Sequence, residues 1–152
     1  MNIQIDTREK ARAIKKILAH FNDIGVKYYS SKLFVGDYMS LDNPRLIIDR
    51  KQNLLEVVSN VCQGHKRFVS EIQRACDNGI KLIFLVEHSK NIKTLDDVRN
   101  WENPRLATSP YAVSGGQLHK TLSTLQSKYG VEFLFCEKKD TGRRIVELLG
   151  EI

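Results

Sequence analysis

The chain has 152 residues, of which 41% are hydrophobic and 28% are charged. This length supports one folded domain with a full core, so we expect a single domain over residues 1–152. No apolar run approaches the ~20 residues that a membrane-spanning helix needs, and no signal-peptide pattern is present, so a cytoplasmic protein without a membrane partner is expected. The formal net charge of +6 favours a polyanionic partner without identifying one.

The cysteines and histidines do not indicate a metal site. Cys62, Cys76 and Cys136 are odd in number and have no C-x-x-C spacing. Neither a disulfide framework nor a zinc site is therefore indicated, and we expect buried, reduced thiols. The four histidines show no H-x-x-x-H spacing, which argues against a histidine-based site.

The beginning of the chain predicts a strand, a helix and a second strand. Residues 2–6 alternate between polar and apolar and predict the first strand. Asp6 or Thr7 is the expected N-cap of the amphipathic helix that follows. Residues 26–32 are rich in aromatic and β-branched side chains and predict the second strand.

A pair of strands joined by a turn at residues 42–44 is predicted between Asp37 and Lys51. Alternation over 37–41 and the apolar run 46–48 indicate the two strands. On adjacent antiparallel strands, Asp37 at the start of one and Asp49 at the end of the other lie close together on one face. Lys51 follows Asp49 by two residues and shares that face.

This grouping predicts a magnesium site. Two carboxylates this close repel each other and need a cation, and Mg²⁺ takes oxygen ligands. A bound metal would activate water for phosphodiester hydrolysis, while Lys51 would orient the water or stabilise the charged transition state. From the residues alone, the alternative stays open that Gly36-Asp37 marks a turn and that residues 49–51 form a solvated strand end.

Apolar periodicity predicts the remaining elements. Four helices are expected: one after the N-cap residue Asn53, one over 66–77, one from Gly115 to Gly130 and one over 141–149. Strands are expected over 80–86 and 131–136. The strand over 80–86 is nearly all apolar, as expected for a central strand covered on both faces and paired in parallel after a helical crossover. Residues 87–114 predict a long loop near the site or a partner surface, with one short helix over 95–101. The element order predicts an α/β three-layer sandwich with a central mixed sheet flanked by helices.

Two further regions of the sequence are candidates for a phosphate contact. His65 lies beside Lys66 and Arg67 before a helix, where it would meet phosphate. The segment 114–116 followed by Lys120 resembles a phosphate-binding helix start, but it lacks the P-loop spacing, so we interpret it as a loop-to-helix junction.

Five ordered motifs resemble the nuclease domain of the XPF-type (xeroderma pigmentosum group F) structure-specific endonucleases, which belong to the restriction-endonuclease-like PD-(D/E)xK group. The motifs are IDTRE at 5–9, GDY at 36–38, IDRK at 48–51, RF at 67–68 and the strand end LVE at 85–87. The resemblance spans about residues 2–87. It implies a restriction-endonuclease-like fold and a Mg²⁺-dependent DNA endonuclease, with Mn²⁺ as a substitute, that acts on branched or flapped DNA in repair or recombination.

By resemblance, Asp37 and Asp49 are metal ligands and Lys51 is the catalytic lysine. Asp6 matches an acidic position close to the same metal, so the resemblance implies a catalytic and ligand role for it too.

The resemblance also implies nucleic-acid-binding roles for Arg8, Arg50 and Arg67. Glu9 and Arg50 fall on functional motif positions without a defined role. The alternatives are a helix-start acid for Glu9 and surface charges for Arg50 and Arg67.

The chain departs from the family pattern at several positions. Asp49 stands where the family usually has Glu, and Leu55 replaces an expected acid, with Glu56 one place later. No helix-hairpin-helix tail or helicase domain is expected, so a homodimer or a partner protein would supply recognition of DNA structure. The alternative function is a catalytically inactive DNA-binding or scaffold subunit, but the intact set of acidic residues argues against it. A weaker alternative is a nuclease that acts on RNA.

Overall fold

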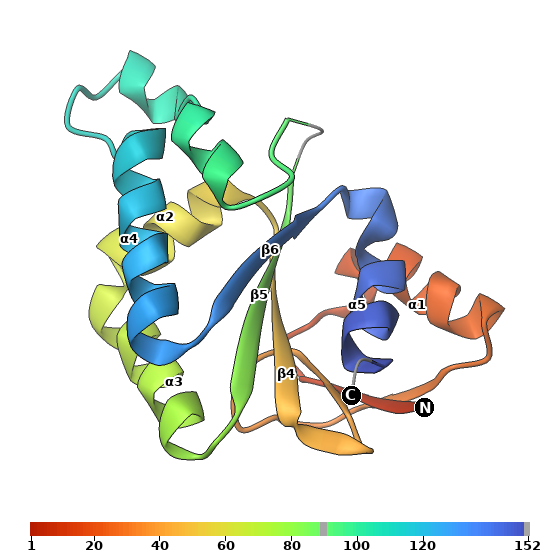
Figure 1. Cartoon of the computed structure of the whole chain (residues 1–152). Helices are drawn as coiled ribbons and strands as arrows, with labels where there is room; N and C mark the ends of the chain where they lie inside the picture. The colour runs from red at the N-terminus through yellow and green to blue at the C-terminus, as the bar shows by residue number, and fades with distance from the viewer. Residues whose placement is uncertain (89–90, 151–152) are drawn as a thin grey trace.

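Six strands form one mixed sheet in the spatial order β2-β1-β3-β4-β5-β6 (Figure 1). The computed structural model describes residues 1–88 and 91–150. The strands are β1 (Asn2–Ile5), β2 (Lys27–Ser30), β3 (Tyr38–Ser40), β4 (Asn43–Lys51), β5 (Lys81–Glu87) and β6 (Glu132–Cys136). β3 pairs antiparallel with β1 and β4, whereas the β1–β2, β4–β5 and β5–β6 pairs are parallel.

Helices cover both faces of this sheet, which confirms the predicted three-layer α/β sandwich. On one face lie α1 (Lys15–Asp23) and α5 (Thr141–Gly150), and on the other lie α2 (Leu54–Cys62), α3 (His65–Asp77) and α4 (Gly115–Tyr129) (Figure 1). Short 3-10 helices also occur in the described part of the chain: η1 (Ala11–Ala13), η2 (Asp96–Asn100), η3 (Pro104–Ala107) and η4 (Lys138–Asp140). Among the described residues, no helix is long and apolar enough to cross a membrane.

Strand alternation directs neighbouring residues of β4 and β5 into two separate cores. Ile47 and Phe84 pack in the core beneath α2, α3 and α4, whereas Ile48 and Leu85 pack in the core beneath α1 and α5. β5 is therefore apolar on both faces and lies between two parallel neighbours, as predicted.

The predicted helix start at Asp6 or Thr7 is wrong. The first α-helix begins only at Lys15, after a 3-10 turn, and its N-cap residue is Ile14. The Asp6 carboxylate instead accepts hydrogen bonds from the backbone N–H groups of Arg8 and Leu33. Tertiary hydrogen bonding thus replaces the local cap that the sequence indicated.

Other boundaries and exposures also differ from expectation. β2 covers only Lys27–Ser30, and β4 begins at Asn43, which shortens the predicted turn. The thiols of Cys62 and Cys76 are exposed, not buried, because both residues lie at the edges of their helices' apolar stripes; all three cysteines are free, as predicted.

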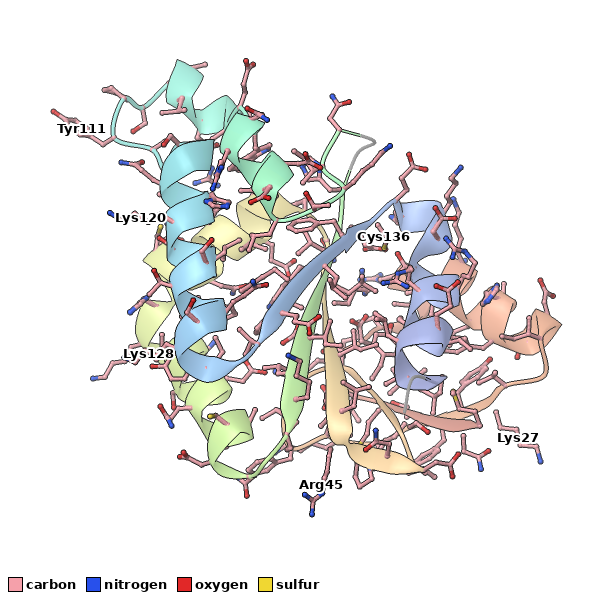
Figure 2. All side chains as sticks on the ribbon, viewed as in Figure 1. Lys27, Arg45, Tyr111, Lys120, Lys128 and Cys136 are labelled. Carbon is pink, nitrogen blue, oxygen red and sulfur yellow. The ribbon has the colours of Figure 1, made fainter. Side chains whose placement is uncertain are left out.

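The segment between β5 and α4 is anchored more firmly than a simple loop. Ile92 and Val98 are buried in the core beneath α4, and the predicted helix over 95–101 is the 3-10 helix η2. Tyr111 projects from the end of this segment with 95% of its surface exposed, and Lys120 and Lys128 point outward from α4 (Figure 2).

Gly36 forms the tight turn that delivers the chain to β3. Its φ of +68° lies in the left-handed region, and a Cβ at this position would come within 2.5 Å of the Ile47 side chain and 3.2 Å of the Ile48 carbonyl oxygen. Because Asp37 is the next residue, this close backbone approach fixes where its carboxylate enters the site.

We expect Gly36→Ala to lower the free energy of unfolding by about 2–4 kcal/mol, because it adds a clash with the Ile47 side chain and a tight contact with the Ile48 carbonyl to the strain of a positive φ. Gly25→Ala is the matched control, since Gly25 has a φ of +74° with no atom within 4 Å of an added Cβ. It should cost only about 1 kcal/mol. Equal losses for the two variants in urea denaturation would contradict the proposed close packing at Gly36.

Candidate functional site

A cleft of about 280 Å³ opens where β3, β4, α2 and α3 meet. Its lining includes Asp37 from the turn before β3, together with Asp49 and Lys51 from the end of β4. α3 contributes Arg67 and Glu71 from the opposite side. Acidic and basic side chains thus face one another across a polar hollow.

The β3–β4 register brings Asp37 and Asp49 together, as the sequence predicted. The Asp37 N–H donates to the Ile48 carbonyl at 2.8 Å, and Tyr38 pairs with Ile48. Both carboxylates are buried, and Asp37 Oδ2 accepts a hydrogen bond from the Arg50 N–H at 2.9 Å. Burial raises the pKa of Asp37 well above its ordinary value of 3.8, and the adjacent Asp49 carboxylate raises that pKa further.

The Lys51 amine completes this group. Its Nζ lies 3.4 Å from Asp49 Oδ1, and its side chain is only 10% exposed. The same nitrogen lies 5.5 Å from the ring centroid of Phe68 and 5.7 Å from that of Phe84. These rings limit the space open to the amine and hold its charge beside the aspartates.

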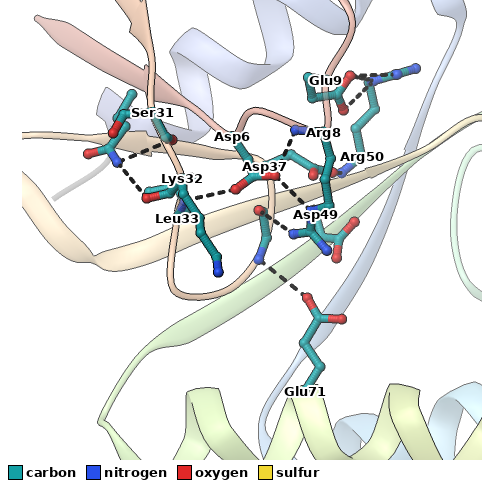
Figure 3. Close-up of polar contacts among 12 residues, drawn as sticks. Asp6, Arg8, Glu9, Ser31, Lys32, Leu33, Asp37, Asp49, Arg50 and Glu71 are labelled. Carbon is teal, nitrogen blue, oxygen red and sulfur yellow. Dashed lines mark hydrogen bonds and ion pairs between the residues drawn. The ribbon is translucent and has the colours of Figure 1, made fainter.

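Asp6 adjoins this group through its backbone, but its carboxylate has other partners. The Asp6 N–H donates to the Asp37 carbonyl at 2.8 Å. Its Oδ1 accepts from the Leu33 N–H at 2.8 Å, and its Oδ2 accepts from Arg8 Nε at 2.7 Å (Figure 3). Burial alone would raise the pKa of Asp6, but these hydrogen bonds lower it. The metal-ligand role of Asp6 stays a prediction, and the observed contacts give it the additional task of fixing Arg8.

The residues present suit a hard cation with few protein ligands. Within residues 1–88 and 91–150, no group of three or more His, Cys, Asp or Glu side chains converges closely enough to hold a metal together. Asp37 and Asp49 offer oxygen donors only, and they repel each other when both are ionised. Mg²⁺ fits such a pair, because it is commonly bound through one or two carboxylates, with waters and substrate phosphate as its other ligands.

Glu71 is a cleft residue that the sequence reasoning missed. Its Oε1 accepts a hydrogen bond from the Gly36 N–H at 3.3 Å, and the contact links α3 to the turn before Asp37 (Figure 3). Burial and the nearby Asp49 charge raise its pKa. The sequence could have indicated this position, because Glu71 follows Arg67 by four residues and therefore lies on the same face of the helix.

Arg50 points to the opposite face of the sheet and is buried in an ion-pair network. Its guanidinium contacts Glu9 Oε2 and Glu87 Oε1, each at 2.7 Å, and Thr141 Oγ1 donates to Glu87 Oε2 at 2.6 Å. Burial alone would lower the pKa of Arg50, but the hydrogen bond to Glu9 and the neighbouring charges raise it. Glu9 is consequently a partner of Arg50 and not a helix-start acid. Two carboxylates hold its guanidinium and only 7% of its side chain is exposed, although the residue contributes to the cleft lining.

The other predicted nucleic-acid-binding residues are exposed. Arg67 lines the cleft, and Arg8 lines both this cleft and a neighbouring cavity. His65 is the first residue of α3 and lies outside the cleft lining, with Nδ1 3.2 Å from the Val61 carbonyl oxygen. Arg8 and Arg67 are thus placed to meet a phosphate near the aspartates, and His65 lies apart from them.

Arg50→Met should lower the free energy of unfolding by about 3–5 kcal/mol, because it leaves Glu9 and Glu87 buried without a counter-charge. Arg67→Met is the matched control, since that side chain is exposed, and it should change stability by less than about 0.5 kcal/mol. If the two variants unfold at the same denaturant concentration, the structural role of Arg50 is refuted.

Asp37→Asn should stabilise the metal-free protein at neutral pH by about 1–3 kcal/mol. Because the pKa of Asp37 is raised in the folded state, ionising this group costs stability above that pKa and costs none below the ordinary value of 3.8, where both states are protonated. Denaturation in EDTA should therefore show the gain at pH 7 and its loss near pH 4. A gain that persists unchanged at low pH would contradict this electrostatic origin.

Comparisons with known proteins agree with the resemblance seen in the sequence. The ERCC4 domain family model matches residues 5–148. The structure of XPF from Aeropyrum pernix aligns with a TM-score of 0.65 at 19% identity, covering 98% of this chain and 60% of that one. XPF from Aeropyrum pernix in complex with DNA aligns with a TM-score of 0.67 at 19% identity, covering 97% of this chain and 62% of that one. No curated protein sequence matches the chain.

These alignments confirm the predicted restriction-endonuclease-like fold. The chain spans about three fifths of the length of the XPF chains to which it is similar. The family match extends from the end of β1 to the last turns of α5, so it includes the whole cleft. The chain belongs to the ERCC4 domain family.

Proposed function

We propose that the protein is a Mg²⁺-dependent DNA endonuclease that hydrolyses phosphodiester bonds in the cleft between β4 and α3. The observation that carries this proposal is the buried Asp37–Asp49 pair with the Lys51 amine 3.4 Å from Asp49. A merely structural site gains nothing from two adjacent carboxylates, since their repulsion costs stability. The match to the ERCC4 domain family supports a DNA nuclease.

In this proposal Asp37 and Asp49 hold the metal, for which Mn²⁺ can substitute. When bound, the metal supplies activation of water and neutralisation of charge on the phosphodiester. Lys51 places a positive charge beside the same phosphate, where it orients the attacking water or stabilises the negative charge that develops. Its burial beside two packed aromatic rings excludes competing solvent and strengthens that interaction.

Exposed arginines position the substrate. Arg67 lines the cleft directly, and Arg8 reaches it from the other side, where Asp6 and the Gly36 carbonyl hold the guanidinium. A guanidinium fixed in this way binds phosphate oxygens with little loss of side-chain freedom. His65 and Arg50 are assigned no substrate contact in this proposal.

Recognition of branched or flapped DNA is proposed to involve a second copy of the chain or a partner protein, in repair or recombination. The solved XPF structures are longer than this chain, and one of them is a complex with DNA. The net charge of +6 favours such a polyanionic substrate.

We expect Mg²⁺ or Mn²⁺ to support nicking of flapped DNA, and EDTA to abolish it. Asp49→Asn and Lys51→Met should each reduce the cleavage rate by about 10²-fold or more, since each removes a group that acts on the developing charge. Single-turnover cleavage of labelled flapped, linear and RNA substrates provides the measurement.

Matched controls separate these effects from general changes of charge. Asp42→Asn alters an exposed acid in the β3–β4 turn, and Lys128→Met alters an exposed lysine of α4; neither should change the rate more than twofold. Full activity in Asp49→Asn or Lys51→Met would overturn the assignment. Tight DNA binding without any metal-dependent cleavage would instead identify an inactive binding subunit.

A further inference from the structure

A second cavity, of about 350 Å³, lies beside the proposed catalytic cleft. Arg8, Lys32 and Arg74 line it together with the ring of Phe34, and Asp6 lies at its inner wall. Arg8 lines both hollows and so marks the boundary between them. A ligand in this cavity would therefore be continuous with one in the catalytic cleft.

The burial of the residues on either side of Phe34 explains why its ring is exposed. Leu33 and Val35 are buried, at 6% and 1% exposure, and alternation along the extended chain leaves the Phe34 ring outside, at 55%. The Arg74 guanidinium lies 5.2 Å from the centre of this ring. The ring is thus held by a cation at the surface and does not pack into either core.

The electrostatics of the cavity favour an anion. Arg8, Lys32 and Arg74 are all exposed cations, and the Arg8 side chain is 64% accessible. The single carboxylate, Asp6, is 1% exposed and accepts hydrogen bonds from Arg8 and Leu33. Cations beside an exposed aromatic ring match the chemistry of a nucleotide, whose base stacks on the ring while its phosphate meets the charges.

We propose that this cavity binds an unpaired nucleotide of the DNA substrate, next to the phosphate that is cut. The base stacks on Phe34, and the flanking phosphates contact Arg8, Lys32 and Arg74. This inference rests on the proposed nuclease function and adds to it a base-stacking subsite beside the cleavage site. Paired bases are excluded, because in a duplex their faces are already stacked on neighbouring base pairs.

The test is the affinity of the full chain for fluorescently labelled flapped, single-stranded and blunt duplex DNA in EDTA, where no cleavage can occur. Phe34→Ala should weaken binding of flapped and single-stranded DNA by roughly 10-fold and change duplex binding less than twofold. Phe34→Trp keeps a stacking surface and should retain wild-type affinity. Tyr111→Ala, which removes an aromatic side chain 95% exposed on another part of the surface, should have no effect.

Phe34→Trp also gives a direct signal of stacking. Trp101 is the only tryptophan in the natural chain, so titration of the wild-type protein supplies the background. Single-stranded DNA should quench the fluorescence of the introduced indole, and blunt duplex should quench it much less.

Three outcomes would overturn the proposal: unchanged affinity in Phe34→Ala, an equal loss for duplex and single-stranded DNA, or a change in oligomeric state on the same substitution, which would make Phe34 a protein contact.

The result is separable from the nuclease assignment, because binding is measured without metal. A Phe34-dependent affinity with no cleavage in Mg²⁺ would refute only the nuclease. Metal-dependent cleavage with normal binding by Phe34→Ala would refute only the subsite.

Discussion

The approach of the Asp37 and Asp49 carboxylates is the constraint on which the rest of the site depends. Backbone structure holds these two buried carboxylates adjacent through the turn at Gly36, the β3–β4 register and the Arg50 N–H that donates to Asp37. The repulsion between these carboxylates lowers the stability of the fold, and the burial of apolar side chains in two cores offsets that loss. Such a preformed, charged site is suited to binding a cation without rearrangement.

Strand β4 performs two different tasks with three consecutive residues. Asp49 and Lys51 line the cleft beside α2 and α3, while the guanidinium of Arg50 between them pairs with Glu9 and Glu87. Because side chains alternate along a strand, β4 carries the aspartate and lysine of the cleft on one face and the ion-paired arginine on the other. A displacement of β4 along its axis would disturb both faces at once.

The sequence predicted those features that follow from strand geometry and apolar periodicity. The interior position of β5 and the meeting of Asp37, Asp49 and Lys51 depend on local sequence patterns. The partners of Asp6 and Arg50 could not be predicted, because they come from residues distant in the chain, such as Leu33 and Glu87. The same reason explains the false N-cap, because the Asp6 carboxylate bonds to the Leu33 N–H, a tertiary partner that the local sequence does not reveal.

The hydrogen bond from Thr141 to Glu87 has a consequence for how this domain can be divided. Thr141 is the first residue of α5, and through Glu87 it is linked to the Arg50 guanidinium of β4. A recombinant fragment ending before Thr141 would lose this hydroxyl and also uncover the apolar surface on which α5 packs. Such a truncation is expected to aggregate, because α5 covers one of the two apolar cores.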